Sequence, residues 1–320
     1  LQHMNRSVFK DPVSLMNNIL HVTDYLKEQI RAQGGDPQRE TLDFVCAKSG
    51  EPYFIDSFGE YWRAYHFVED AYALEEVKDP QDFYESAVAF GNFQRMLADF
   101  PADTLTETIA GFHDTKARFA AFEKAVEEDV CGRAAGVKQE IRFIKDRYDV
   151  ACVLGDLLEA GELPLRVTHN DTKSNNVLMD NATGKGLCVI DLDTVMPGLA
   201  VNDFGDSIRF GASTGAEDEK DLSKISCDME LYDIYAKGFV EGCGGALTDM
   251  EIECLPIGAK VMTYECGMRF LTDYLSGDTY FKVDYPTHNL DRTRTQLKLV
   301  WDMEQKWDQM QEIARKYKNK

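Results

Sequence analysis

One polar segment, Thr168–Asn176, constrains the fold of this chain more than any other feature. It follows a short apolar run, and two further apolar runs, residues 177–179 and 187–190, come after it. Between those two runs lies Asn181–Gly184, and short strand-like runs around such a turn are typical of a β-hairpin. We therefore expect a strand, a polar loop and a hairpin, with the hairpin returning Asp191 to the side of the loop.

The side chains in this segment suggest a reaction. His169, Asp171 and Asn176 form the pattern H-x-D-x4-N, and Asp191 and Asp193 end the second hairpin strand. Phosphoryl transfer needs a positioned acceptor hydroxyl and metal ions that neutralise the phosphate oxygens. Asp171 can accept the hydroxyl proton, and Asn176 and Asp191 offer the oxygen ligands that Mg²⁺ prefers. Asp193 has two possible roles, as a ligand of a second metal ion or as a hydrogen-bond acceptor for nearby backbone.

These residues resemble the phosphate-transfer core of the aminoglycoside phosphotransferase and choline kinase superfamily, which is related to the protein kinases. The resemblance implies Asp171 as the catalytic base, Asn176 and Asp191 as magnesium ligands, and His169 as an organiser of the loop. It also implies ATP and Mg²⁺ as cofactors. Lys173 either stabilises charge on the transferred phosphoryl group or lies on a solvated surface.

Longer stretches resemble the N-acetylhexosamine 1-kinases over nearly all of the chain. They are Leu165–Lys173, Ile190–Thr194, Asp203–Ser213, Thr106–Ala110, Glu265–Leu271 and Asn289–Gln296. Enzymes of that family phosphorylate the anomeric hydroxyl of N-acetylglucosamine or N-acetylgalactosamine with ATP and Mg²⁺. The resemblance therefore implies this activity, with ATP and an amino sugar as the partners.

Four residues are candidates for binding that substrate: Asp171, Phe210, Arg269 and Tyr280. Arg269 lies in an apolar, helix-like stretch, and a buried arginine needs a partner. The partner is either a core carboxylate or the substrate, and the resemblance favours the substrate. Phe210 and Tyr280 either pack against a sugar ring or belong to the core.

The triplet Asp203-Phe204-Gly205 resembles the metal-binding triplet of protein kinases, but it lies beyond the hairpin. Because Asp191 already occupies the place expected for that ligand, we predict Asp203 and Asp206 to brace a loop.

The N-terminal part carries the candidate nucleotide contacts. Tyr65, His66, Phe67 and Val68 match the connector that offers backbone groups to adenine in kinases, and a plain edge strand is the alternative. Leu1–Asn5 resembles the third strand of the small lobe in the hexosamine kinases. We therefore expect the small lobe to be incomplete at its N-terminus, without the turn that covers the phosphates and without the strand lysine of a V-A-I-K motif.

The predicted fold class is α+β, a protein-kinase-like bilobal fold. Residues 1–70 are expected to form a small mixed lobe that covers the nucleotide, and residues 71–320 a larger, mainly helical lobe that carries catalysis and substrate binding. Apolar spacing and turn residues predict the individual elements. The main predicted helices are 11–30, 105–128 and 137–159, with further helix after Asp79-Pro80 and from about Leu222, and the predicted N-terminal strands are 42–47, 53–56 and 61–68.

The composition limits the possible partners. The formal charge of −21 repels nucleic acid and anionic membrane surfaces. No apolar run approaches the roughly 20 residues that span a bilayer. The eight cysteines include no C-x-x-C pair, which argues against a zinc site and favours a reducing cytoplasm. The sequence does not fix the oligomeric state.

Two other functions remain open. The acidic charge suits a kinase for a cationic acceptor such as choline or an aminoglycoside, although a solvated acidic surface is the simpler explanation of the charge and the surrounding motifs do not resemble such a kinase. A catalytically silent nucleotide-binding protein is the other alternative, and the presence of Asp171, Asn176 and Asp191 together argues against it.

Overall fold

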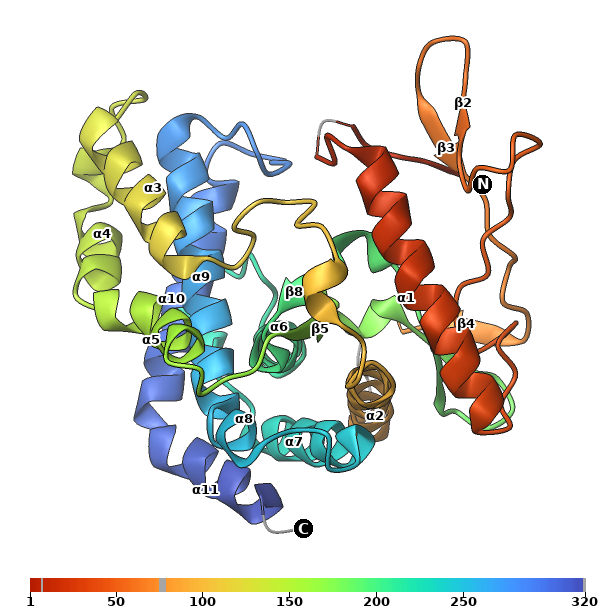
Figure 1. Ribbon diagram of the computed structural model, residues 1–320. Helices are drawn as coiled ribbons and strands as arrows, with labels where there is room; N and C mark the ends of the chain where they lie inside the picture. The colour runs from red at the N-terminus through yellow and green to blue at the C-terminus, as the bar shows by residue number, and fades with distance from the viewer. Residues whose placement is uncertain (7, 75–78, 319–320) are drawn as a thin grey trace. The chain divides into compact units, whose positions relative to one another are not determined.

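The computed structural model describes residues 1–6, 8–74 and 79–318 of the 320-residue chain. Its strands are short and its helices long, as Figure 1 shows. The strands are β1 (Gln2–His3), β2 (Phe54–Ile55), β3 (Tyr61–Arg63), β4 (Ala71–Ala73), β5 (Arg166–Thr168), β6 (Val177–Asp180), β7 (Gly186–Val189) and β8 (Met196–Gly198). The helices are α1 (Pro12–Ala32), α2 (Pro80–Met96), α3 (Thr115–Glu128), α4 (Lys138–Lys145), α5 (Tyr148–Glu159), α6 (Ala200–Gly211), α7 (Met229–Cys243), α8 (Asp249–Glu253), α9 (Leu255–Ser276), α10 (His288–Gln305) and α11 (Trp307–Lys318). Short 3₁₀ turns include η3 (Ser174–Asn176) and η4 (Leu192–Thr194).

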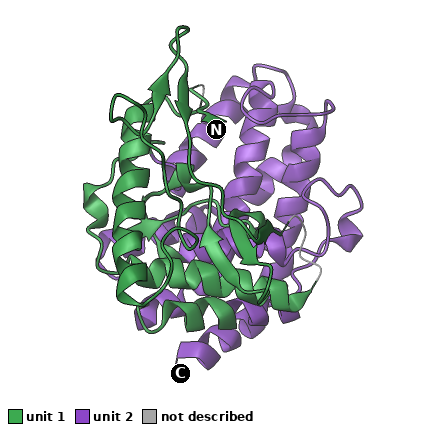
Figure 2. Cartoon of the chain, turned by 90° about the vertical axis from the view of Figure 1, so that its right-hand side faces the viewer, with its two compact units in different colours: residues 1–110, 165–200, 237–247 green, residues 111–164, 201–236, 248–320 purple. Residues whose placement is uncertain are grey.

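The chain forms two compact units, which Figure 2 distinguishes by colour. Unit 1 comprises residues 1–110, 165–200 and 237–247, and unit 2 comprises residues 111–164, 201–236 and 248–320. All the strands named above belong to unit 1, whereas unit 2 is helical with connecting loops. Each unit combines separate segments of the chain, and the lobe boundary expected near residue 70 stays a prediction.

The first helix forms where its end signals and apolar spacing predict it. The Asp11 side chain accepts a hydrogen bond from the backbone N–H of Ser14 at 3.1 Å, and Pro12 occupies the first turn. Its buried apolar face repeats at helical spacing. That face consists of Leu15, Met16, Ile19, Val22, Leu26 and Ile30.

Two predicted helices are wrong in extent. The helix predicted over 105–128 begins only at Thr115, where the Asp114 side chain caps Ala117, because Gly111 adopts a left-handed backbone conformation just before it. The helix predicted over 137–159 is broken into α4 and α5. Arg147 stands at the break, where its guanidinium binds the carbonyl of Phe143 at the end of α4.

Further differences concern the strands and α6. Of the strand predicted over 42–47, only an isolated bridge between Phe44 and Tyr65 is formed, and the strand predicted over 61–68 ends at Arg63. The segment 200–211, over which no helix was predicted, is helix α6. Gly205 there allows close helix packing, because a Cβ on it would lie 2.3 Å from the backbone oxygen of Gly258.

Three small antiparallel sheets organise unit 1. Their strand orders are β1-β3-β2, β4-β6-β7 and β5-β8. The predicted hairpin is confirmed as β6 and β7, with Val177 opposite Val189 and a left-handed Gly184 in its turn. Strand β5 leads into the polar loop and pairs with β8, which follows η4. The sheets therefore support the loop from both of its ends.

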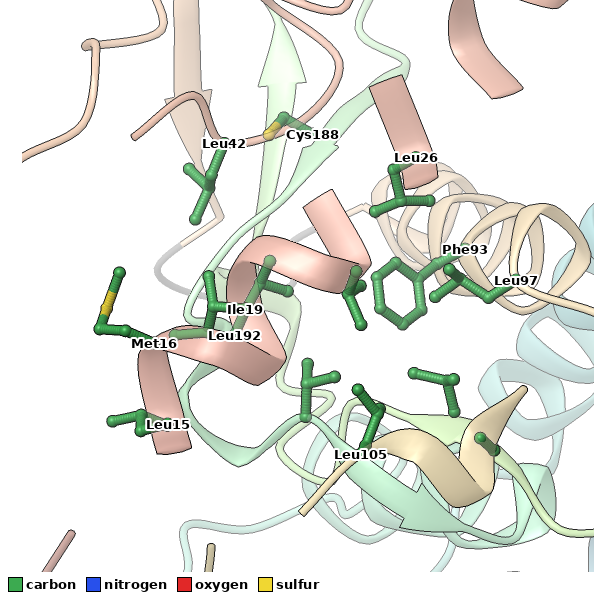
Figure 3. Close-up of a cluster of buried hydrophobic side chains, with 14 of the residues drawn as sticks. Leu15, Met16, Ile19, Leu26, Leu42, Phe93, Leu97, Leu105, Cys188 and Leu192 are labelled. Atoms are coloured by element: carbon green, nitrogen blue, oxygen red, sulfur yellow. The ribbon is translucent and has the colours of Figure 1, made fainter. Parts of the chain in front are cut away.

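The core of unit 1 fixes the residues after the hairpin. Leu192 is buried in a cluster that includes Met16 and Ile19 of α1, and Figure 3 shows these side chains together. Because Leu192 is held in this core, the backbone of the flanking Asp191 and Asp193 has little freedom to move. The hydrophobic packing of α1 thus sets the position of two carboxylates.

None of the described helices combines the length and the apolar character needed to cross a membrane. All eight cysteines lie within the described residues and are free thiols.

Candidate active site

The polar loop is held in place by hydrogen bonds to the end of the hairpin. His169 is fully buried, accepts the backbone N–H of Asp171 through Nδ1 at 3.3 Å and donates from Nε2 to the carbonyl of Ile190 at 2.8 Å. The Thr194 hydroxyl donates to the carbonyl of His169 at 2.6 Å, and the Asn170 amide donates back to Thr194 at 2.8 Å. These bonds lock the loop beside the hairpin strand, which fits the predicted organising role of His169.

Asp171, Lys173 and Asn176 meet on this loop. The amide nitrogen of Asn176 donates to the carbonyl of Asp171 at 2.7 Å and to its Oδ2 at 3.3 Å. Lys173 Nζ lies 2.8 Å from Asp171 Oδ1, and both side chains remain partly exposed. Lys173 therefore contacts Asp171, the predicted base, and is not a lysine surrounded by solvent alone.

Asp191 closes the cluster from the hairpin side. Its backbone is left-handed, with φ of 59°, as is that of Asn170, with φ of 65°. The protein atoms packed around the carboxylate raise the pKa of Asp191, and the neighbouring Asp193 and Asp171 carboxylates raise it further. Three carboxylates therefore converge within unit 1, and this negative potential favours a bound cation.

Asp193 has a partner that the sequence analysis missed. Arg63 at the end of β3 is buried, and its Nη1 lies 2.5 Å from Asp193 Oδ1. Arg63 also donates from Nε to Gln2 Oε1 at 2.9 Å. One signal was available, since Arg63 is a lone charge in the aromatic stretch Tyr61–Phe67 and a buried arginine needs a carboxylate.

The donor atoms fit a magnesium ion that also binds nucleotide. Among the described residues, no group of three or more His, Cys, Asp or Glu side chains is arranged to hold a metal ion. Mg²⁺ commonly takes only one or two protein ligands and completes its shell with phosphate oxygens and water. Because both hydrogen bonds of the Asn176 amide use its nitrogen, the carbonyl oxygen is left for a cation. Asn176 and Asp191 suit a magnesium site with only two protein ligands.

The predicted nucleotide connector forms neither a helix nor a regular strand. The backbone N–H of His66 bonds the carbonyl of Asp43 at 2.9 Å, and the His66 ring contacts the Asp43 carboxylate at 2.8 Å. No other described residue hydrogen-bonds the backbone N–H of Phe67 or Val68. Tyr65 packs against Phe44, Val68 is buried, and Phe67 is 82% exposed. Phe67 and Val68 thus retain backbone groups that a ligand can bind.

Arg269 and Tyr280 come together in unit 2. The Arg269 guanidinium lies 5.3 Å from the ring centre of Phe112, 5.8 Å from that of Tyr280 and 5.6 Å from that of Phe281. No described side chain forms an ion pair or hydrogen bond with it. The nearby carboxylate of Glu265, one turn earlier on α9, is instead bound by His113 at 2.9 Å and Thr115 at 2.6 Å. The hydrogen-bond donors of Arg269 are therefore not used by the described residues.

Phe210 and the two aspartates before it lie on α6. Phe210 is 42% exposed, so it is not a core residue. Asp203 and Asp206 are buried on the helix, and Asp206 Oδ1 lies 2.9 Å from Arg209 Nη2. Arg209 also pairs with Glu217 in the segment after α6, and the prediction that both aspartates brace a loop stays a prediction.

The amino-acid sequence matches one protein family over most of its length. Residues 37–233 match the phosphotransferase enzyme family, abbreviated APH, over more than half of the chain. The chain therefore belongs to the APH phosphotransferase enzyme family.

Solved structures agree on the fold. An aminoglycoside phosphotransferase from Alicyclobacillus acidocaldarius matches with a TM-score of 0.59 and 13% identity, over 95% of this chain and 84% of that one. Spectinomycin phosphotransferase in complex with ADP and spectinomycin matches with a TM-score of 0.53 and 13% identity, over 92% and 83%. Choline kinase from Cryptosporidium parvum matches with a TM-score of 0.51 and 13% identity, over 94% and 82%. The predicted α+β, protein-kinase-like fold is confirmed.

Proposed function

We propose that this phosphotransferase uses ATP and Mg²⁺ to phosphorylate the anomeric hydroxyl of N-acetylhexosamines. The observation that carries the choice of acceptor is Arg269, an arginine with unused donors among three aromatic rings. Sugar hydroxyls and the acetamido carbonyl accept hydrogen bonds from a guanidinium, and the apolar faces of a sugar ring pack on aromatic side chains. The sequence resemblance to the hexosamine 1-kinases supports the same acceptor.

The proposed reaction assigns a role to each residue of the loop. Asp171 accepts the proton of the attacking hydroxyl, and His169 holds the backbone of the loop so that this carboxylate is presented. Lys173, which contacts Asp171, stabilises negative charge as transfer proceeds. Asn176 and Asp191 hold Mg²⁺, which neutralises the phosphate oxygens of ATP when bound. Asp193, predicted as a further metal ligand, is held by Arg63 and acts through its charge.

The proposed adenine contact is the connector Tyr65–Val68. The unused backbone N–H groups of Phe67 and Val68 suit the edge of a purine, as does the exposed ring of Phe67. A complex of the spectinomycin enzyme contains ADP, which supports nucleotide use by a chain of this fold. A reducing cytoplasmic setting, consistent with free thiols, is part of the proposal.

A cationic acceptor is the second candidate, and the choline kinase and aminoglycoside phosphotransferase of similar fold favour it. The formal charge of −21 also attracts cations. Against it, Arg269 is accompanied by Arg118, whose pKa is lowered by burial and by the positive charge of Arg269. Two neighbouring guanidinium groups repel an ammonium group, so we rank the neutral amino sugar first.

An acceptor panel tests the proposal. The purified protein with ATP and Mg²⁺ is offered N-acetylglucosamine, N-acetylgalactosamine, choline and kanamycin, and each product is identified by ³¹P NMR. A sugar 1-phosphate is the expected product. Transfer only to choline or kanamycin supports the second candidate, and no transfer with ATP bound supports a silent nucleotide-binding protein. Leaving out Mg²⁺ is expected to abolish turnover.

A further inference from the structure

Asp273 organises the loop that follows α9. Its side chain is buried, and its Oδ1 accepts the backbone N–H groups of Thr279 and Tyr280, each at 2.9 Å. Its Oδ2 accepts the backbone N–H of Phe281 at 3.0 Å. One carboxylate therefore binds three successive backbone donors, and hydrogen bonds from such donors to an ionised acceptor are stronger than those between neutral groups.

Other bonds close the same loop. The Asn289 amide bridges Asp273 Oδ2 and Asp278 Oδ1, at 2.9 Å to each. Asp278 has a left-handed backbone, with φ of 59°, and its other oxygen lies 2.6 Å from Arg133 Nη1. Asp273 is thus the centre of a small polar network that turns the chain sharply after Gly277.

This network places two aromatic rings. Tyr280 and Phe281 lie directly on the anchored backbone, and their rings lie within 6 Å of the Arg269 guanidinium. Arg269 precedes Asp273 by one helical turn on α9, so the arginine and the loop anchor share one rigid element. Tyr280 is 59% exposed, which means that packing alone does not hold it there.

We infer that Asp273 is a positioning residue for acceptor binding, which sets the aromatic loop 279–281 against Arg269 and so determines the affinity for the amino sugar. It acts through Tyr280 and Arg269 and does not touch the substrate. This inference rests on the proposed function, since it assigns the acceptor to Arg269 and Tyr280. Its physical basis is that a loop with three satisfied backbone donors loses little entropy when a ligand binds.

The test compares Asp273→Asn with a matched control, Asp302→Asn. Asp302 is also a part-buried helix carboxylate of unit 2 that accepts a backbone N–H, that of Cys227 at 2.8 Å, but it belongs to a different network. Asp273→Asn is expected to raise the KM for N-acetylglucosamine about tenfold, with the KM for ATP unchanged within a factor of about two. Asp302→Asn is expected to leave both KM values unchanged. An equal rise in the KM for N-acetylglucosamine in the two variants, or no rise of this KM in Asp273→Asn, overturns the inference.

A second readout separates positioning from a general loss of stability. If Asp273 acts through Tyr280, adding Asp273→Asn to a Tyr280→Ala variant raises the KM for the sugar by less than about twofold further. If the two substitutions instead multiply their separate effects on the KM for the sugar, the inference is overturned.

A third measurement does not depend on the substrate. Lys282 is exposed and directly follows the anchored loop, so trypsin is expected to cleave after it faster in Asp273→Asn than in wild type or Asp302→Asn. Equal cleavage rates overturn the loop-anchoring claim. If the wild-type protein transfers phosphate to none of the sugars, the proposed function fails, and the proteolysis result still decides whether Asp273 anchors the loop.

Discussion

Arg63 and Asp193 join the β1-β3-β2 sheet to the turn after the β6–β7 hairpin, with 2.5 Å between Nη1 and Oδ1. Arg63 is buried, and Asp193 is two residues beyond the proposed magnesium ligand Asp191. The pair places a fixed positive charge beside a group of carboxylates. Of the two, Arg63 lowers the pKa of Asp191, in opposition to the larger effects of burial and of the Asp193 and Asp171 carboxylates, which raise it.

A double-mutant cycle on this pair is the first prediction. Arg63→Met leaves Asp193 largely buried without its cation, so we expect the free energy of unfolding to fall by about 3 kcal/mol. Adding Asp193→Asn is expected to recover part of that loss, with a coupling energy of about 1–3 kcal/mol by urea denaturation. Additive single effects contradict the ion pair as a source of stability.

The second prediction concerns Asp171, the proposed catalytic base. Asp171→Asn removes the proton acceptor but keeps the side-chain size, so we expect kcat to fall by about 10²–10⁴-fold with little change in the melting temperature. The control is Asp24→Asn, an α1 carboxylate that is 69% exposed and pairs with Lys27 at the surface. Steady-state kinetics with a coupled ADP assay measures both. Turnover near the wild-type rate in Asp171→Asn removes this residue from the role.

Glycine packing between α2 and α7 gives a third prediction. A Cβ on Gly91 would lie 2.3 Å from the backbone oxygen of Phe239 and 2.9 Å from the backbone nitrogen of Cys243. Gly91→Ala is therefore expected to lower the free energy of unfolding by about 2 kcal/mol or more, despite the better helix propensity of alanine.

Gly155→Ala on α5 is the matched control for this packing. The nearest atom to its Cβ would be Lys116 Cε at 3.7 Å, an ordinary contact with a flexible side chain. We expect this variant to be neutral or more stable by up to about 1 kcal/mol. Guanidinium unfolding curves measure the stability of both alanine variants. A loss in Gly91→Ala alone supports a close helix contact at Gly91, whereas an equal loss in both variants indicates a general cost of adding a methyl group.

The fourth prediction is a pH dependence at Asp302. Burial opposes ionisation of this carboxyl, but Lys306, the backbone N–H of Cys227 and the Ser226 hydroxyl outweigh it and lower the pKa of Asp302. A lowered folded-state pKa contributes stability above the unfolded value of about 3.9, and that contribution is lost as the pH falls through the folded value. Asp302→Asn should therefore cost about 1–3 kcal/mol at pH 7 and progressively less as the pH drops below about 4. A pH-independent difference in urea unfolding contradicts this assignment.

The sequence predicted the parts of this fold that local signals specify. The Asp11-Pro12 start of α1, the hairpin around Gly184 and the meeting of His169, Asp171 and Asn176 on one loop depend on short-range patterns. The substrate-binding roles and the metal ligands remain predictions, because no local pattern fixes what a side chain binds.

The failures have a tertiary cause. No helix was predicted over residues 200–211, because glycine is unfavourable inside a helix, but Gly205 is needed where α6 approaches the backbone of Gly258. The partner of Arg63 was missed because Asp193 lies 130 positions further along the chain, and no spacing rule connects positions so far apart. Similarly, the three backbone bonds to Asp273 depend on how the chain turns after Gly277.

The left-handed backbone at Asn170 and Asp191 has an evolutionary consequence. Glycine adopts this conformation without a steric penalty, so glycine at either position relieves local strain in the folded chain. At Asp191 the same replacement deletes a proposed magnesium ligand, and at Asn170 it deletes the bond to Thr194. A laboratory selection for heat tolerance alone is therefore expected to drift toward glycine at Asp191 but to retain Asn170, whereas a selection that also demands turnover is expected to retain both side chains.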